Sequence, residues 1–219
     1  MRVVIAGGHG KIALILERLL SARGDEAVGL IRNPDQAADL EAAGAEAVVL
    51  DLEQASVNEV ADAVRGAAAV VFAAGAGPGS GADRKQTVDR DAAILLADAA
   101  EAASVGRYVM VSALAADDRS LDKNYDEVFL AYMRAKSEAD ADVRARTGLR
   151  TTIVRPGGLT DEPGTGTVTI AESTGRGSIP RDDVARVLLA VLHEPEAAGR
   201  TFEVISGETP IEAALHPTR

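Results

Sequence analysis

Residues 1–13 read MRVVIAGGHGKIA, and this stretch decides the fold. A short apolar run stops at Gly7, and from Lys11 onward apolar residues recur at the spacing of one helix face. The order of elements is therefore strand, glycine turn, helix. Gly7 permits a tight turn, Gly10 lets the backbone approach a phosphate, and Ala13 lets the helix pack close to the strand.

The start of this helix is suited to an anion. Its free N–H groups would point at a pyrophosphate, where the helix dipole favours negative charge. His9, Lys11 and Ile12 lie in or just after the turn, so we include them with the two glycines among the candidate cofactor-binding residues. The alternatives are a glycine turn that merely joins a strand to a helix, a plain loop role for His9, and a solvated Lys11.

Composition bounds the remaining possibilities. The chain has 219 residues, enough for one full core, and we expect a single domain spanning 1–219. There are no cysteines, which excludes disulfides, thiolate catalysis and cysteine metal sites. The three histidines are far apart and lack metal-ligand spacing, so no metal site is expected. A net charge of −11 argues against a nucleic-acid partner, which requires a concentrated basic surface.

The N-terminus and the hydropathy pattern give expectations about location. Met1 leads straight into the first strand without a charged region or cleavage site, and no apolar run approaches the roughly 18 residues needed to cross a membrane. We therefore expect a cytoplasmic protein without a membrane partner. The expected partner is a small-molecule substrate, and composition leaves a homo-oligomer open.

Strands and helices alternate along most of the chain. Further strands are expected at 27–31, 48–50, 68–73, 107–111 and 151–154, with helices at 34–43, 57–64, 85–103 and 126–146. A glycine-rich loop at 74–81 and a polar loop at 113–125 interrupt them. This alternation predicts an α/β Rossmann fold, a doubly wound parallel sheet with helices on both faces, whose ligands lie at the carboxyl ends of the strands.

The alternation breaks down after Pro156. Residues 157–180 are rich in Gly, Thr and Ser, with a short strand expected at 167–170. A helix at 181–193, a strand at 201–205 and a short helix at 211–215 are expected to follow. We expect 157–180 and 206–219 to form a small C-terminal cap on the substrate side.

Arg32 occupies the end of the second strand, the position that selects the cofactor in such folds. A carboxylate there binds the ribose hydroxyls of NAD, whereas a guanidinium suits the dianionic 2′-phosphate of NADP. Because no acid lies between Val28 and Asn33, we predict NADP(H) and count Asn33 with the site. The alternative is a solvated surface arginine.

Two other strand ends also point to a nucleotide. Asp51 and Leu52 follow the third strand, where an adenine ring would stack and Asp51 could accept from its exocyclic amine. The alternative, that Asp51 caps the next helix, is equally open. Ala73, Ala74 and Gly75 follow the fourth strand, and their side chains are small enough for a cofactor to pass over the backbone.

Tyr132 and Lys136 are four residues apart on the long helix and share one face. An ammonium beside a phenol lowers the phenol pKa from about 10 toward the working pH, which makes Tyr132 a candidate proton donor to a carbonyl. Ser112 lies just beyond the fifth strand, on the same edge of the sheet, and could hydrogen-bond that carbonyl. A tyrosine and a lysine at this spacing also occur by chance on many helices.

Together these motifs resemble the short-chain dehydrogenase/reductase superfamily, and more narrowly its atypical, NAD(P)-binding group related to NmrA-like proteins and biliverdin reductase B. The resemblance rests on the glycine motif, Arg32, Asp51-Leu52, the strand end 109–112, Tyr132-x-x-x-Lys136 and the turn 154–157. It implies an NADP(H)-binding Rossmann fold, with Pro156 of that turn at the cofactor.

The resemblance also implies a catalytic set. Its members would be Ser112, Tyr132 as proton donor and Lys136, which also holds the nicotinamide ribose. The resemblance places Asp89 where conventional members have the asparagine that completes the set, as is common in the atypical group. Ser112 precedes Tyr132 by 20 residues, more than the usual spacing, so the intervening loop must fold back.

The function expected from the sequence is an NADP(H)-dependent oxidoreductase. It would transfer a hydride between the nicotinamide and a small carbonyl, quinone or flavin-type acceptor. One alternative is a non-catalytic redox sensor that binds NADP(H), as NmrA-like proteins do. A further alternative is an NAD(P)-dependent epimerase or dehydratase, which the small cap disfavours because a sugar nucleotide is bulky.

Overall fold

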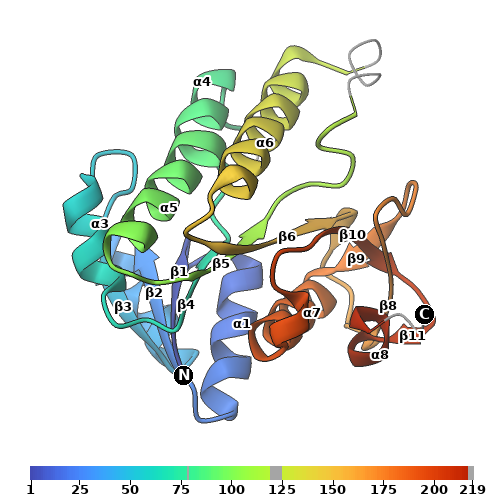
Figure 1. Ribbon diagram of the computed structural model, residues 1–219, viewed down its shortest axis with the longest axis horizontal. Coiled ribbons are helices and arrows are strands. Elements are labelled where there is room, and N and C mark those ends of the chain that lie inside the picture. The colour runs from blue at the N-terminus through green and yellow to red at the C-terminus, as the bar shows by residue number, and fades with distance from the viewer. Residues whose placement is uncertain (78, 119–124, 217–219) are drawn as a thin grey trace.

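The computed structural model describes residues 1–77, 79–118 and 125–216. Within these ranges nine strands form the main sheet: β1 (Arg2–Ala6), β2 (Glu26–Ile31), β3 (Ala45–Val49), β4 (Ala69–Phe72), β5 (Arg107–Val111), β6 (Arg150–Pro156), β8 (Thr167–Ala171), β10 (Thr201–Ser206) and β11 (Thr209–Pro210). Their order is β11-β8-β10-β6-β5-β4-β1-β2-β3 (Figure 1). The strands from β3 to β10 in this order are parallel, and β8 is antiparallel to its two neighbours.

Helices cover both faces of this sheet. On one face lie α1 (Lys11–Ala22), α2 (Ala37–Ala42) and α7 (Arg181–His193), and on the other α3 (Val57–Val64), α5 (Ala92–Ala102) and α6 (Glu127–Ala145) (Figure 1). The short helix α8 (Ile211–Leu215) packs beside β8. The predicted doubly wound α/β sheet is confirmed.

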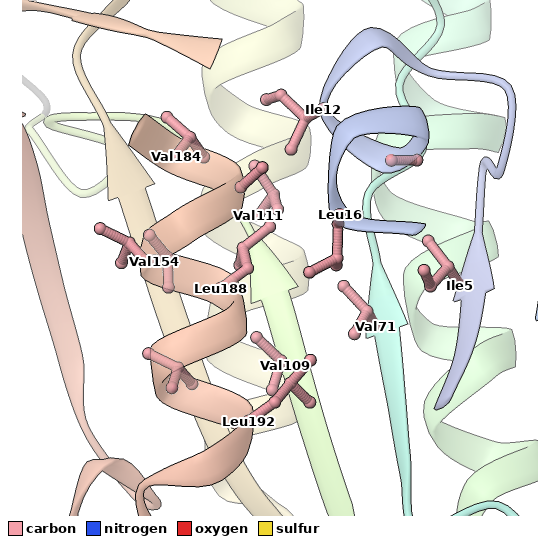
Figure 2. Close-up of a cluster of buried hydrophobic side chains, with 14 of the residues drawn as sticks. Ile5, Ile12, Leu16, Val71, Val109, Val111, Val154, Val184, Leu188 and Leu192 are labelled. Atoms are coloured by element: carbon pink, nitrogen blue, oxygen red, sulfur yellow. The ribbon is translucent and has the colours of Figure 1, made fainter. Parts of the chain in front are cut away.

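The face covered by α1 and α7 shows how the sheet is held. Leu16 of α1 lies over Val71 of β4, while Leu188 and Leu192 of α7 point toward Val109 of β5 (Figure 2). All five side chains are inaccessible to solvent. Burying one such side chain stabilises the fold by about 1.5–3 kcal/mol, so this layer fixes α1, and the turn before it, against the strands.

The position of β1 in the sheet determines where a ligand binds. The chain moves outward from β1 to β2 and β3, then returns to build β4, β5 and β6 on the other side of β1. The connections therefore diverge at the carboxyl ends of β1 and β4 and open a crevice there, which is the ligand position of doubly wound sheets.

The helix predicted at 85–103 consists of three consecutive segments. They are α4 (Ala82–Arg84), the π-helical segment η2 (Lys85–Asp91) and α5. A π-helical segment holds an extra residue per turn and occurs often at functional sites. The sequence pattern did not predict it, because the apolar spacing of 88–99 fits a regular helix equally well.

The remaining differences concern short elements. The strands β7 (Gly158–Thr160) and β9 (Ser178–Pro180) form a separate two-stranded parallel sheet, and they and β11 were not predicted. Each is too short for periodicity and exists because a partner strand pairs with it. The single-turn 3-10 helices η1 (Pro34–Gln36) and η4 (Pro195–Ala197) start at prolines. The expectations at 78, 119–124 and 217–219 lie outside the described residues.

In the described ranges, no helix combines the length and apolar character that crossing a membrane requires.

Candidate functional site

The glycine turn after β1 is shaped by close backbone contact. Gly7 has a φ of +82°, and a Cβ placed on it would lie 2.6 Å from the Cα of Ala74. The Gly10 N–H donates to the Gly7 carbonyl at 2.9 Å, and Gly10 caps α1 without a side-chain hydrogen bond. The turn therefore has no room for a side chain at Gly7 and leaves the first N–H groups of α1 open to a ligand.

A cavity of about 260 Å³ lies at the carboxyl ends of β1 to β4. The predicted cofactor residues that line it are Gly7, His9, Gly10, Arg32, Asp51, Leu52, Ala73, Ala74 and Gly75. They come from four strand ends that are far apart in the sequence, as expected for a binding crevice at the switch point of the sheet.

Five other predicted cofactor residues do not line this cavity: Lys11, Ile12, Asn33, Lys136 and Pro156. Lys11 forms an ion pair with Asp161 at 2.6 Å, and Ile12 packs in the core. Asn33 caps η1, and the Pro156 carbonyl accepts from the N–H of residue 114 at 3.0 Å. Lys11 lies at the N-terminus of α1, whereas Asp161 follows β7, so the pair connects the cofactor turn to the predicted cap.

Two of the lining residues have their own partners. The imidazole Nε2 of His9 lies 2.7 Å from Asp39 Oδ2 on α2. The Asp51 carboxylate accepts from the Glu53 N–H at 3.0 Å, within the turn that follows β3. Ser56 caps the next helix, so the alternative that Asp51 caps it is wrong.

Glu53 and Arg84 line the cavity but were not predicted. Arg84 Nη2 donates to Glu53 Oε2 at 2.7 Å, and Arg32 Nη1 donates to the same oxygen at 3.3 Å. The hydrogen bond from Arg84 is the main cause that holds the pKa of Glu53 below its ordinary value. Because Glu53 and Arg84 lie far apart in the sequence, no local pattern could have connected them.

The catalytic candidates Lys136 and Asp89 form a buried ion pair. Lys136 Nζ lies 3.3 Å from Asp89 Oδ1, and the two side chains are 4% and 1% exposed. Asp89 also accepts from the Ala76 N–H at 3.2 Å, and Lys136 donates to the Val111 carbonyl at 3.2 Å. The lysine is therefore fixed between η2, α6 and the end of β5, and Ala76, which holds Asp89, is itself part of the cavity wall.

Tyr132 lies beside this pair. Lys136 Nζ is 5.8 Å from the centre of its ring, and Lys85 Nζ is 5.4 Å from it. Burial raises the pKa of Tyr132, and the lowering by Lys136 does not offset it. The predicted lowering of this pKa is thus wrong, because removing a phenolate from water costs more than the lysine regains at this distance.

Ser112 is buried and its hydroxyl is already paired. Ser112 Oγ donates to Asp140 Oδ2 at 2.9 Å, and Arg155 Nε donates to the same oxygen at 2.9 Å. Burial raises the pKa of Asp140, with Arg155 acting in the opposite direction. Asp140 was missed, although it lies four residues after Lys136 and therefore on the same helix face as Tyr132.

The described residues fit a nicotinamide dinucleotide. The turn at Gly7 has no room for a Cβ, which leaves the backbone free to approach a pyrophosphate. Arg32 and Arg84 line the cavity together with Ala73, Ala74 and Gly75, whose side chains are small or absent.

Comparison with known proteins shows the family of the chain. The sequence profile of a family described as NAD(P)H-binding matches residues 7–195. The chain is 43% identical over 216 residues to the uncharacterized sugar epimerase YhfK of Bacillus subtilis, which covers 98% of this chain and 99% of YhfK.

Two solved structures share the fold over nearly their whole length. A Bacillus halodurans protein, provisionally named an NAD-dependent epimerase/dehydratase, has a TM-score of 0.91 and 36% identity, with 100% of both chains covered. The oxidoreductase ylbE of Lactococcus lactis has a TM-score of 0.85 and 26% identity, covering 99% of this chain and 95% of that one. The chain therefore belongs to the NAD(P)H-binding family and resembles the atypical short-chain dehydrogenases/reductases.

Proposed function

We propose that the protein is an NADP(H)-dependent oxidoreductase that reduces a small carbonyl, quinone or flavin-type acceptor. The observation that carries the proposal is the buried Lys136–Asp89 ion pair beside Tyr132, which adjoins the nucleotide-sized cavity through Ala76. A buried charge pair is costly to desolvate, and its place beside a phenol and against Ala76 of the cavity wall favours catalysis over a purely structural role.

The proposed chemistry of a carbonyl substrate is a two-electron reduction. NADPH, when bound, supplies the hydride to the carbonyl carbon. Tyr132 donates the proton of its hydroxyl to the carbonyl oxygen, so the C=O group becomes an alcohol. The nearby ammonium of Lys136 stabilises the tyrosinate that remains, and Asp89 holds that ammonium in place. Lys136 is also the residue that we assign to the nicotinamide ribose.

Ser112 has a more limited role in this proposal than the sequence indicated. Its proton is donated to Asp140, so the Ser112 oxygen can act toward other groups only as a hydrogen-bond acceptor. To donate to a substrate carbonyl, Ser112 would first have to release Asp140. We therefore assign the proton transfer to Tyr132, and Ser112 orients a substrate carbonyl only when its hydroxyl turns from Asp140 to the substrate.

At the other end of the cavity, Arg32 is the proposed ligand of the 2′-phosphate, with the adenine beside Asp51 and Leu52. We also propose that the chain is one domain, that the segment around β7 and β9 covers the substrate, and that the protein acts in the cytoplasm.

The test has two stages. Nicotinamide fluorescence titrations measure NADPH and NADH binding to the wild type and to Arg32→Ala, and we expect a preference for NADPH that the variant loses. A turnover screen with carbonyls, quinones and flavins then uses Tyr132→Phe, for which we expect carbonyl reduction to fall about 10²–10⁴-fold. Failure of the wild type to bind either nucleotide would remove the proposal.

The names of two relatives support a second candidate, an NAD(P)-dependent epimerase or dehydratase. Such an enzyme would use the same tyrosine and lysine but would return the hydride to its substrate. Net consumption of NADPH in the turnover screen separates the two, because an epimerase consumes none.

A further inference from the structure

Three donors converge on the carboxylate of Glu53. Arg84 Nη2 reaches Oε2 at 2.7 Å, Thr87 Oγ1 reaches Oε1 at 2.7 Å, and Arg32 Nη1 reaches Oε2 at 3.3 Å. The Glu53 side chain is 19% exposed, whereas those of Arg32 and Arg84 are 57% and 37% exposed. The carboxylate is thus a half-enclosed acceptor between two arginines that solvent can still reach.

This cluster lies in the wall of the nucleotide cavity. Arg32 follows β2, Glu53 follows β3 and Arg84 ends α4, and all three line the cavity together with Asp51. The end of β2 is where the ribose of a bound dinucleotide lies in this type of sheet. The two arginines and the glutamate therefore surround the position at which NADP and NAD differ.

The charges of the cluster have opposite effects on the two cofactors. A 2′-phosphate is a dianion that guanidinium groups bind well, and it would compete with Glu53 for the same donors. The ribose 2′-hydroxyl of NAD is itself a donor, and a carboxylate accepts from it. Glu53 thus opposes a 2′-phosphate while offering an acceptor to a 2′-hydroxyl.

We infer that Arg84 and Glu53 determine the choice between NADP and NAD, with Arg84 as a second cation for the 2′-phosphate and Glu53 as the counter-ion that the phosphate must displace. This inference rests on the proposed cofactor site. It predicts that the wild type binds both cofactors and prefers NADP moderately. Replacing Glu53 with the uncharged glutamine should make the preference for NADP much stronger.

The test uses two small probes of the adenosine end. 2′,5′-ADP carries the discriminating phosphate and 5′-AMP lacks it, so calorimetric titration of both isolates the 2′ position without any turnover. Glu53→Gln should tighten 2′,5′-ADP about tenfold and leave 5′-AMP unchanged or weaker, because a competing charge is removed. Arg84→Ala should weaken 2′,5′-ADP about tenfold and leave 5′-AMP unchanged.

The chain offers matched controls for both variants. Arg90 lies on η2 near Arg84 in sequence but pairs with Asp91 and Glu138, and it does not line the cavity. Arg90→Ala and Glu138→Gln therefore change the net charge by the same amounts as the two test variants. We expect each to change the affinity for 2′,5′-ADP by less than about twofold, since exposed pairs contribute little.

Each outcome decides the matter. Equal affinities of Glu53→Gln and Glu138→Gln for 2′,5′-ADP would overturn the role of Glu53. An Arg84→Ala variant that loses both probes equally would overturn the role of Arg84. If NADPH and NADH also fail to bind the wild type, the cofactor proposal falls together with this inference. If they bind and neither the Glu53 nor the Arg84 substitution changes the affinity for 2′,5′-ADP, only the inference is overturned. Thermal melting of each variant shows whether it is folded.

Discussion

Ser112 Oγ donates to Asp140 Oδ2 at 2.9 Å, and Arg155 holds the same carboxylate through Nε at 2.9 Å. Asp140 is inaccessible to solvent and Arg155 is 7% exposed. The hydroxyl at the end of β5 is therefore oriented by a charge pair from α6 and β6. This arrangement fixes which way the serine points before any substrate arrives.

Asp140→Asn should lower the free energy of unfolding by about 3 kcal/mol, because it leaves a buried guanidinium with a weaker partner. Urea unfolding measures this change. Asp142→Asn is the matched control, since Asp142 lies on the same helix and pairs with the arginine at 146, but is more exposed. We expect the control to cost less than about 1 kcal/mol, and equal losses in both variants would contradict the structural weight given to Asp140.

The carboxyl group of Glu17 gives a prediction about pH. Glu17 is inaccessible to solvent, neither oxygen has a hydrogen-bond partner among the described residues, and burial raises its pKa to about 8. An unfolded chain ionises this group near pH 4.3, whereas the folded protein keeps it protonated until about pH 8. Stability should therefore fall as the pH rises between these values and change no further above them.

Glu17→Gln removes the ionisation while keeping the shape. The stability advantage of the wild type over this variant should shrink by about 2–4 kcal/mol between pH 5 and pH 8. Urea unfolding at several pH values provides the measurement. Parallel pH curves for the two proteins would show that Glu17 is ionised in the folded state.

Gly7→Ala should cost more than Gly24→Ala, although both glycines have a positive φ, of +82° and +79°. A Cβ at Gly7 meets the Ala74 backbone at 2.6 Å, whereas a Cβ at Gly24 has nothing within 4 Å. We expect a loss of roughly 1–2 kcal/mol at Gly24 from backbone conformation alone. For Gly7→Ala we expect a larger loss in the free energy of unfolding, measured by urea unfolding, together with loss of NADPH binding. Equal stability losses and equal NADPH affinities in the two variants would show that crowding at the turn is unimportant.

The raised pKa of Tyr132 predicts the pH profile of carbonyl reduction. Because burial keeps the phenol protonated beyond its ordinary pKa of about 10, the proposed proton donor is present throughout the neutral range. The kcat/KM of reduction should show no decline due to this residue up to about pH 9. A decline with an apparent pKa near 7 that disappears in Tyr132→Phe would mean that the bound state lowers the tyrosine pKa after all.

The sequence predicted the parts of the fold that repeat. The strand at 107–111 and the helix at 181–193, for example, were predicted to within one residue of their observed bounds. Burial of a strand or of one helix face imposes a spacing of apolar residues that the sequence shows directly. The strands β7 and β9 were not predicted because pairing with each other, and not composition, makes them strands. The same holds for β3, which begins at Ala45, earlier than its apolar residues indicate, through pairing with β2.

In the candidate site, too, the sequence predicted the residues that follow from a regular pattern and missed those that depend on tertiary contacts. Glycines, Arg32 and Asp51 were placed at the cavity because strand ends in this fold converge there. Glu53 and Arg84 were not, since their contact depends on how the loop after β4 returns to the sheet. The sign of the Tyr132 pKa shift was also beyond the sequence, because it depends on the degree of burial and not on the spacing to Lys136.

The π-helical segment η2 changes the directions in which side chains point before it relative to those after it. Ahead of it, Arg84 reaches Glu53 in the cavity wall, while within it Asp89 reaches the lysine of α6. In an unbroken α-helix each residue advances by about 100°, so deleting one residue from η2 would turn Arg84 away from Glu53 while α5 kept its packing. Inserting or deleting a single residue in η2 can therefore change the direction of Arg84 separately from the pairing of Asp89 with Lys136.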